Sequence, residues 1–178
     1  MRNAFTLLTA SMATTAAHGR TPLTPVSDLD LERYAGTWHE IARLPMYFQR
    51  KCAGSVTARY EPRADGTVAV HNECVTAEGT TIASDGVARR PDSYARGKLE
   101  VCFAPAWLSW LPLAWADYWV LALDENYQWA MVGQPRRKCL WILSRTPSMG
   151  RATFESLKSG AVAMGYDLSP LIISGTVE

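Results

Sequence analysis

Apolar and polar residues alternate in eight short segments between residues 38 and 145. In residues 67–75, Val68 and Val70 fall on one face, and His71 and Glu73 fall on the other. A period of two is typical of a β-strand with one buried face. The predicted strands are residues 38–44, 55–60, 67–75, 80–88, 98–103, 118–123, 127–132 and 140–145.

Short connections with turn residues separate most of these segments, as in residues 62–66 (PRADG). Eight strands that each follow their neighbour predict an antiparallel up-and-down meander. Eight is also the strand number whose closed barrel can hold one small ligand, and closure removes exposed strand edges. The predicted fold class is therefore all-β, an eight-stranded antiparallel barrel.

The period changes near residue 150. Apolar residues then recur at helical spacing: Phe154, Leu157, Ala161 and Met164. Gly165 stands where a helix C-cap glycine is expected, so one α-helix over residues 151–164 is predicted to pack outside the barrel. Residues 28–33 (DLDLER) predict a short helical turn with an aspartate cap, and residues 171–173 predict a last short strand.

Composition sets the class of protein. With 178 residues, 48% of them hydrophobic and 20% charged, the chain suits one globular domain, assigned to residues 20–178. A formal net charge of +1 gives no reason to expect nucleic acid as a partner. Seven tryptophans and seven tyrosines indicate a ligand cavity or an apolar surface, with extra core as the alternative.

Residues 1–19 have the features of a cleaved signal peptide. Arg2 gives a positive start, a mildly apolar stretch follows, and small residues at 15–19 offer cleavage sites. Threonine and serine interrupt the apolar stretch, so a disordered tail is the alternative. No run of 18 apolar residues is present, so a membrane-spanning helix is not expected.

The four cysteines fit an oxidising compartment. No two are closer than 22 positions, so the short spacing of a zinc site is absent, and neither metal nor cofactor is expected. Cys52 and Cys74 adjoin neighbouring strands and are predicted to form a disulfide. Cys102 and Cys139 remain by elimination as a second pair, which requires loops of non-adjacent strands to converge.

Three segments carry a family resemblance. They are residues 36–43 (GTWHEIAR), 117–124 (DYWVLALD) and 140–147 (LWILSRTP). In order and at this spacing they resemble the lipocalin family, and within it the branch of bacterial lipocalins, plant temperature-induced lipocalins and apolipoprotein D. His39 departs from the tyrosine usual at that position.

The same segments indicate how the barrel closes. Gly36 and Trp38 open the first strand, and Arg145 ends the last. The indole is expected to plug one end while the guanidinium lies across it, a contact worth about 0.5–2 kcal/mol.

The resemblance also implies a function. The family consists of ligand carriers, so a fatty acid, a lysophospholipid or a similar hydrophobic molecule is expected inside the barrel, with a role in envelope lipid maintenance. Bacterial relatives often carry a lipidated cysteine just after the signal, but here no cysteine precedes Cys52. A periplasmic or secreted protein is therefore expected, with outer-membrane association as an alternative.

Alternation from the closure residues assigns the inner face. If Trp38 points inward, Glu40 and Ala42 on the same strand point inward as well. If Arg145 reaches Trp38, Leu143 and Trp141 share its inward face. In the strand over residues 67–75, Val70 and Asn72 fall on the inner face. The resemblance implies that inward residues also come from the strands over 118–123 and 127–132. The candidate ligand contacts are Glu40, Ala42, Val70, Asn72, Tyr118, Val120, Ala130, Val132, Trp141 and Leu143.

Two of these residues are polar, and each has two interpretations. An inward carboxylate is costly unless it is paired or hydrogen-bonded. Glu40 and Asn72 therefore either belong to a structural network or bind a ligand head group. Trp141 is interpreted as a ligand contact, with a plain core tryptophan as the alternative.

Four connections are expected at the open end of the barrel, the mouth. They carry tryptophans beside cations, the combination that a membrane interface requires. The apolar loop over residues 104–116 is interpreted as a lid, a peripheral membrane contact or a homodimer interface. The mouth residues singled out are Arg50, Lys51, Trp107, Trp110, Trp115, Arg136, Arg137 and Lys138.

An enzyme is not expected. The sequence has no nucleophile elbow and no phosphate-binding glycine loop, and two of its three histidines, His39 and His71, fall on the outer face by alternation. The alternatives to a carrier are an interaction module with a filled barrel and, less favoured, a lipocalin-type isomerase.

Overall fold

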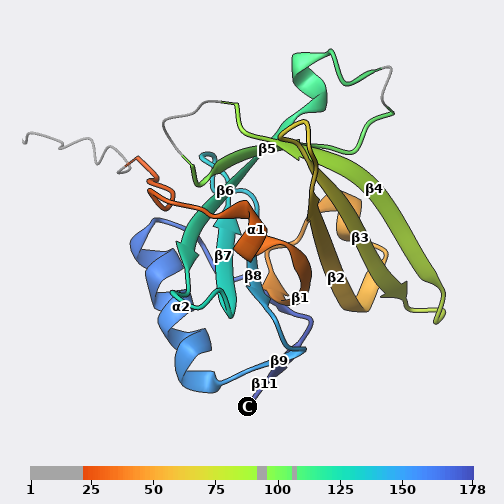
Figure 1. Cartoon of the computed structure of the whole chain (residues 1–178). Helices are drawn as coiled ribbons and strands as arrows, with labels where there is room; N and C mark the ends of the chain where they lie inside the picture. Colours follow the sequence, from red (N-terminus) through yellow and green to blue (C-terminus); the bar gives the residue numbers. More distant parts are fainter. Residues whose placement is uncertain (1–21, 92–95, 106–107) are drawn as a thin grey trace, which may run out of the picture.

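The computed structural model describes residues 22–91, 96–105 and 108–178 and contains the predicted eight-stranded antiparallel barrel (Figure 1). The strands pair in chain order, and the last returns to the first, which closes the sheet. The expected signal peptide lies outside the described residues. The barrel strands are β1 (Gly36–Arg43), β2 (Cys52–Pro62), β3 (Val68–Thr76), β4 (Thr81–Arg89), β5 (Lys98–Cys102), β6 (Ala116–Leu123), β7 (Trp129–Gly133) and β8 (Leu140–Ser144).

The predicted helix is α2 (Arg151–Ala163), which packs outside the barrel (Figure 1). Its apolar side chains Phe154, Leu157 and Ala161 are buried, as their spacing predicted. Gly165 follows the helix with a φ of +85°, a left-handed conformation that glycine adopts without strain.

Short elements complete the chain. The helical turn α1 (Leu31–Tyr34) begins after Asp30, whose side chain caps it by accepting hydrogen bonds from the next turn. Two 3₁₀ turns, η1 (Tyr47–Gln49) and η3 (Pro112–Ala114), lie in the mouth loops. The expected last strand is β10 (Ile172–Ile173), which pairs with β1. The parallel pair β9 (Ser148–Met149) and β11 (Thr176–Val177) was not predicted, because two residues show no period.

Two separate apolar clusters stabilise this arrangement. The inner cluster fills part of the barrel and includes Trp38, Tyr60 and Val120. The outer cluster lies between the barrel wall and α2 and includes Ile142 and Phe154. Burial on both faces explains why several barrel strands are apolar at consecutive positions.

The barrel wall is incomplete beside β4. This strand has nine residues, whereas β5 has five. β4 pairs with β3 from Thr81 to Ala88 but with β5 only from Val87 to Arg89. Among the described residues, therefore, no strand pairs with residues 81–86 on the β5 side, and β4 bends away from its neighbour (Figure 1).

The cysteines agree with the sequence in one pair and differ in the other. Cys52 and Cys74 form the predicted disulfide, which joins the neighbouring strands β2 and β3. The prediction of a second disulfide was wrong, since Cys102 and Cys139 are both free. β6 and β7 separate β5 from β8 in the sheet, and the loops do not bring the two thiols together.

The closed end is held as predicted. The Arg145 guanidinium carbon lies 3.9 Å from the centre of the Trp38 ring. The same guanidinium donates hydrogen bonds to three carbonyl oxygens, those of Tyr127, Thr37 and Arg33. Gly36 has a φ of +93°, and a side chain there would approach Arg145 at 3.5 Å.

We expect Arg145→Ala to lower the free energy of unfolding by about 2–4 kcal/mol, because it removes a cation–π contact and charged hydrogen bonds. Urea denaturation measures this loss. Arg59→Ala is the matched control, since Arg59 is 61% exposed and forms a surface ion pair with Glu61, and we expect it to change stability by less than about 0.5 kcal/mol. Equal effects of the two substitutions would contradict the assigned role of Arg145.

Candidate binding cavity

A cavity of about 460 Å³ lies inside the barrel. Its walls come mainly from β2, β3, β4, β6 and β8, and Phe48, Phe103 and Gln134 extend its lining to the mouth loops. A volume of this size falls within the range of small-molecule sites. Of the predicted contacts, six line the cavity: Glu40, Val70, Asn72, Tyr118, Trp141 and Leu143.

Three other predicted contacts face inward but lie in packed core rather than in the cavity lining. Val120, Ala130 and Val132 are fully buried in the inner cluster with Trp38. Alternation therefore assigned their face correctly, but it could not show how far the floor of the barrel is filled.

The prediction that Ala42 faces the cavity was wrong. The pairing of β1 with β8 passes from Glu40↔Leu143 to Ala42↔Ile142, so one extra residue on β1 forms a bulge. Ile41 and Ala42 consequently both lie in the outer cluster, against the α2 side of the wall. The bulge also turns the next residue, Arg43, to the side of Glu40.

Aromatic rings line a route from the closed end to the mouth. The ring centres of Trp38 and Tyr34 are 4.8 Å apart, and those of Tyr34 and Tyr60 are 5.4 Å apart. The series continues from Tyr60 to Tyr118 at 6.0 Å and from Tyr118 to Trp141 at 6.4 Å. A last contact of 6.4 Å joins Trp141 to Phe48, which is 68% exposed in the first mouth loop. The cavity thus presents a largely aromatic surface along one side.

Three tyrosine hydroxyls meet at the deep end of this series. The Tyr118 hydroxyl lies 2.9 Å from that of Tyr34 and 2.8 Å from that of Tyr60. Burial raises the pKa of Tyr60 to about 12 and raises the pKa values of Tyr34 and Tyr118 well above the usual value, because a phenolate would lose its hydration. All three hydroxyls are therefore uncharged near neutral pH.

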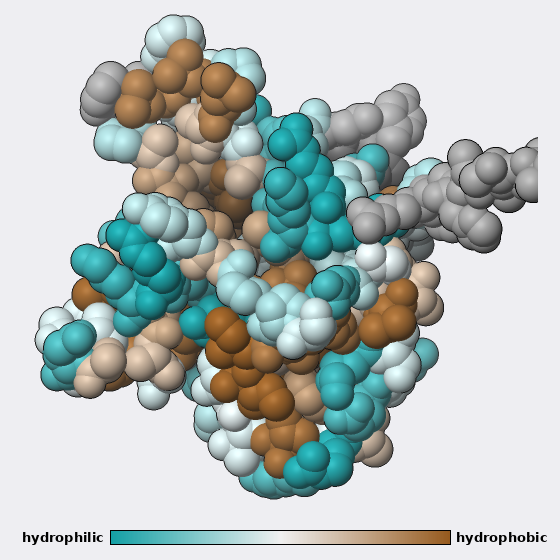
Figure 2. All heavy atoms as spheres, turned by 180° about the vertical axis from the view of Figure 1, so that it is seen from behind, coloured by the Kyte–Doolittle hydropathy of each residue, from teal (hydrophilic) through white to brown (hydrophobic). Residues whose placement is uncertain are grey.

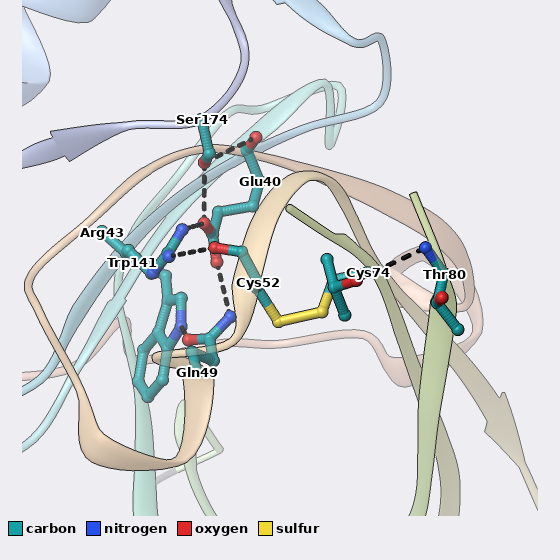
Figure 3. Close-up of a disulfide and its surroundings, with 9 residues drawn as sticks. Glu40, Arg43, Gln49, Cys52, Cys74, Thr80, Trp141 and Ser174 are labelled. Atoms are coloured by element: carbon teal, nitrogen blue, oxygen red, sulfur yellow. Dashed lines mark hydrogen bonds and ion pairs between the residues drawn. A yellow bond between two sulfur atoms is a disulfide. The ribbon is translucent and has the colours of Figure 1, made fainter. Parts of the chain in front are cut away.

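Glu40 belongs to a hydrogen-bond network in the barrel wall (Figure 3). Its Oε1 lies 2.6 Å from Nη1 of Arg43 and accepts from Ser174 Oγ at 2.7 Å. Its Oε2 accepts from Gln49 Nε2 at 2.9 Å, and Gln49 Oε1 accepts from Trp141 Nε1 at 2.9 Å. The carboxylate is thus satisfied on both oxygens, which favours the structural interpretation of Glu40.

Sequence reasoning missed several residues of this site. Arg43 was not found because only the bulge turns it inward. Gln49 lies in a loop, where no period assigns a direction. Tyr60 could have been found, because it shares the inward face of β2 with Ala58 and pairs with Val70. Tyr34 lies on the four-residue helix α1, too short to show a period.

Asn72 differs from Glu40. Its Oδ1 is buried without a hydrogen-bond partner in the described part of the chain, although the residue lines the cavity. A buried carbonyl without a partner costs about 1–3 kcal/mol. Participation of Asn72 in ligand binding remains a prediction, and this unsatisfied oxygen favours it over the structural interpretation.

The mouth exposes large apolar side chains from two loops. In the first, Tyr47 is 80% and Phe48 68% exposed. In the loop over 103–115, Trp110 is 75% and Leu113 100% exposed, and neither lines the cavity. The described part of this loop projects as a hydrophobic lobe at the upper left of Figure 2. In this conformation the two side chains do not cover the cavity.

Cations accompany these side chains. Arg50, Lys51, Arg136 and Lys138 are exposed, whereas Glu78 is the only acidic residue in the sequences of the four mouth connections. Two predicted mouth residues have structural partners instead, since Arg137 donates to the Met164 carbonyl and Trp115 donates to the Ser109 carbonyl. Trp107 lies outside the described residues.

Other kinds of site find no support in the described ranges. Within residues 22–91, 96–105 and 108–178, no group of three or more histidine, cysteine or acidic side chains could hold a metal ion. His71 lies on the outer face, where it contacts Glu73 and Asp85. None of the helices in the described residues is long and apolar enough to cross a membrane.

A closed barrel with one external helix and an apolar inner cavity defines a class of small-molecule-binding proteins. The family described as lipocalin-like domain matches residues 29–175. The chain belongs to the lipocalin family, whose members generally bind small hydrophobic ligands.

Curated relatives support this assignment. Temperature-induced lipocalin-1 of Arabidopsis thaliana is 43% identical over 148 residues, which cover 82% of this chain and 78% of the relative. The outer membrane lipoprotein Blc of Escherichia coli K12 is 35% identical over 168 residues, covering 92% and 90%. Apolipoprotein D of Mus musculus is 30% identical over 162 residues, covering 86% and 80%.

Solved structures agree on the fold. Insecticyanin from the tobacco hornworm Manduca sexta has a TM-score of 0.66 at 24% identity, and the match covers 89% of this chain and 86% of that one. At this identity the similarity shows the architecture alone.

We expect Glu40→Gln to lower the free energy of unfolding by about 3 kcal/mol, since it leaves the buried Arg43 cation without a countercharge. Because Glu40 is satisfied by protein groups, the affinity for a fatty acid such as dodecanoate should change less than about threefold. Urea denaturation and calorimetric titration measure the two effects. Unchanged stability with a large loss of affinity would show instead that Glu40 binds a ligand head group.

Proposed function

We propose that this chain binds a single-chain amphiphile, such as a fatty acid or a lysophospholipid, inside the barrel and carries or stores it without chemical change. The observation that carries the proposal is the cavity of about 460 Å³, lined by aromatic and aliphatic side chains and extending to the mouth loops. Such a lining removes the apolar chain of a ligand from water, which favours binding.

Energetics support real affinity. A dozen buried methylenes contribute roughly 10 kcal/mol, against association costs of roughly 4–15 kcal/mol. Contacts of the head group therefore decide whether binding reaches micromolar strength. Arg50, Lys51, Arg136 and Lys138 are exposed around the mouth, so an anionic head group left there would meet cations.

Export to an oxidising compartment forms part of the proposal. The Cys52–Cys74 disulfide supports it, since such bonds are rare where thiols are kept reduced. One relative is named an outer membrane lipoprotein. We place this protein in the periplasm or outside the cell, with a role in maintaining envelope lipids.

The mouth is proposed as a peripheral contact with anionic lipid. Trp110 and Leu113 would enter the head-group region while nearby cations meet phosphates. Arg50 already lies 3.8 Å from the centre of the exposed Tyr47 ring, which places a cation beside an apolar anchor. A symmetric homodimer through the same surface would bring like charges together, which disfavours it.

Trp141→Ala should weaken dodecanoate binding by about tenfold or more, because it removes a large apolar wall of the cavity. Native mass spectrometry of the gently purified protein, before and after organic extraction, identifies bound lipid, and calorimetric titration gives the affinity. Trp119→Ala is the matched control, since Trp119 packs in the outer cluster and does not line the cavity. Unaltered binding by a folded Trp141→Ala protein would contradict the cavity assignment.

We expect Trp110→Ala/Leu113→Ala to reduce binding to vesicles that contain anionic phospholipid by about tenfold, since it removes two large, exposed apolar side chains of the lobe. Vesicle co-sedimentation at two salt concentrations measures this, and binding of the parent should weaken with salt. Val162→Ala, at an exposed site on α2, is the control. A concentration-dependent dimer that the double substitution abolishes would favour the homodimer instead.

A further inference from the structure

The tyrosine hydroxyls at the deep end of the cavity cannot satisfy one another completely. Three hydroxyls, those of Tyr34, Tyr118 and Tyr60, are joined by two hydrogen bonds. Each hydroxyl brings one proton. Three protons and two bonds leave one O–H group without an acceptor inside the cluster, whichever way each bond is directed.

The protein supplies no other acceptor for this proton within the described residues. The two bonds are the only hydrogen bonds that these hydroxyls make there. A buried donor without a partner is unfavourable, so the proton will be directed toward whatever can accept it. Tyr60 and Tyr118 line the cavity, whereas Tyr34 does not. In two of the three possible arrangements of these bonds, the spare O–H group belongs to Tyr60 or Tyr118 and can point into the cavity. A ligand acceptor at this place would favour those arrangements.

The charge of the surroundings limits what can accept the proton. Among the described residues that line the cavity there is no lysine, arginine or histidine, whereas Glu40 and Asp117 do line it. Arg145 lies against Trp38, on the other side of the floor. An ionised carboxylate at the floor would lose its hydration without meeting a countercharge, which is costly. An uncharged oxygen loses much less hydration free energy on burial than an ionised carboxylate does.

We propose that the floor of the cavity selects a ligand that bears an uncharged oxygen acceptor without a proton of its own, such as a ketone or an ester carbonyl, on the part that reaches Tyr60 and Tyr118. This inference rests on the proposed function, and it narrows the ligand from any single-chain lipid to an oxygenated one. The acidic head group stays at the mouth, and the second oxygen function lies toward the far end of the chain.

Matched ligands test the proposal. Fatty acids of 10 to 16 carbons are compared with the (ω−1)-oxo fatty acids of the same length, so that one chain length brings the ketone oxygen to the floor. At that length we expect the oxo acid to bind about tenfold more tightly than the plain acid in calorimetric titration. Equal affinities at every length, or tighter binding of the plain acid throughout, would overturn the proposal.

A shape-conserving variant locates the effect. Tyr34→Phe/Tyr60→Phe/Tyr118→Phe removes all three hydroxyls together, so that none is left unpaired, and this type of change can be nearly neutral for stability. We expect it to abolish the preference, so that the plain acid and the oxo acid of each length bind the variant with equal affinity. Tyr166→Phe is the control, because the Tyr166 hydroxyl bonds to the Gln134 backbone and Tyr166 does not line the cavity.

The possible results separate the two proposals. A preference that persists in the triple variant would overturn the inference while leaving the carrier function intact. Failure of both ligand series to bind the parent protein would contradict the carrier function itself. If the triple variant does not fold, Tyr60→Phe/Tyr118→Phe tests the two hydroxyls that face the cavity, and the ligand comparison on the parent protein still decides.

Discussion

The contact of the Arg145 guanidinium with Trp38 is the constraint on which the barrel depends. A closed sheet has two open ends, and each admits water unless something covers it. Here one cation lies on the indole ring and binds carbonyl oxygens from α1, from β1 and from the turn before β7. The turn before β7 is far in sequence from α1 and β1, so one side chain fixes the relative positions of distant segments and seals one end. The cavity can therefore be reached through the mouth.

Two kinds of polar arrangement lie in this barrel, and they differ in how completely they are satisfied. Glu40 has a partner on each oxygen, and its network joins β1, the first mouth loop and Trp141. In the tyrosine cluster, by contrast, one O–H group has no acceptor, and Asn72 Oδ1 has no donor among the described residues. A carboxylate with a partner on each oxygen stabilises the wall, whereas unmatched groups that line a cavity favour a ligand that completes them.

Alternation in the sequence predicted most of the fold. All eight strands and α2 were predicted, because strands buried on one face keep a period of two and the helix changes it to 3.6. The inner face of β6 to β8 and the closure by Trp38 and Arg145 followed from the same period and from the family motifs. The prediction failed where period carries no information. The bulge in β1 places Ala42 on the outer face, and alternation assigns no direction to Gln49 because it lies in a loop. The second disulfide required the loops of β5 and β8 to meet, but two strands lie between them in the sheet.

The unpaired stretch of β4 has a consequence for association between molecules. Along residues 81–86, no strand in the described part of the chain pairs with the main-chain N–H and C=O groups on the β5 side. Such an edge is a template on which a strand from another chain can add. Three side chains of the stretch are polar, those of Thr81, Ser84 and Asp85, and Asp85 places a carboxylate near its end. This composition works against fibril growth at an edge that closure of the barrel leaves unpaired.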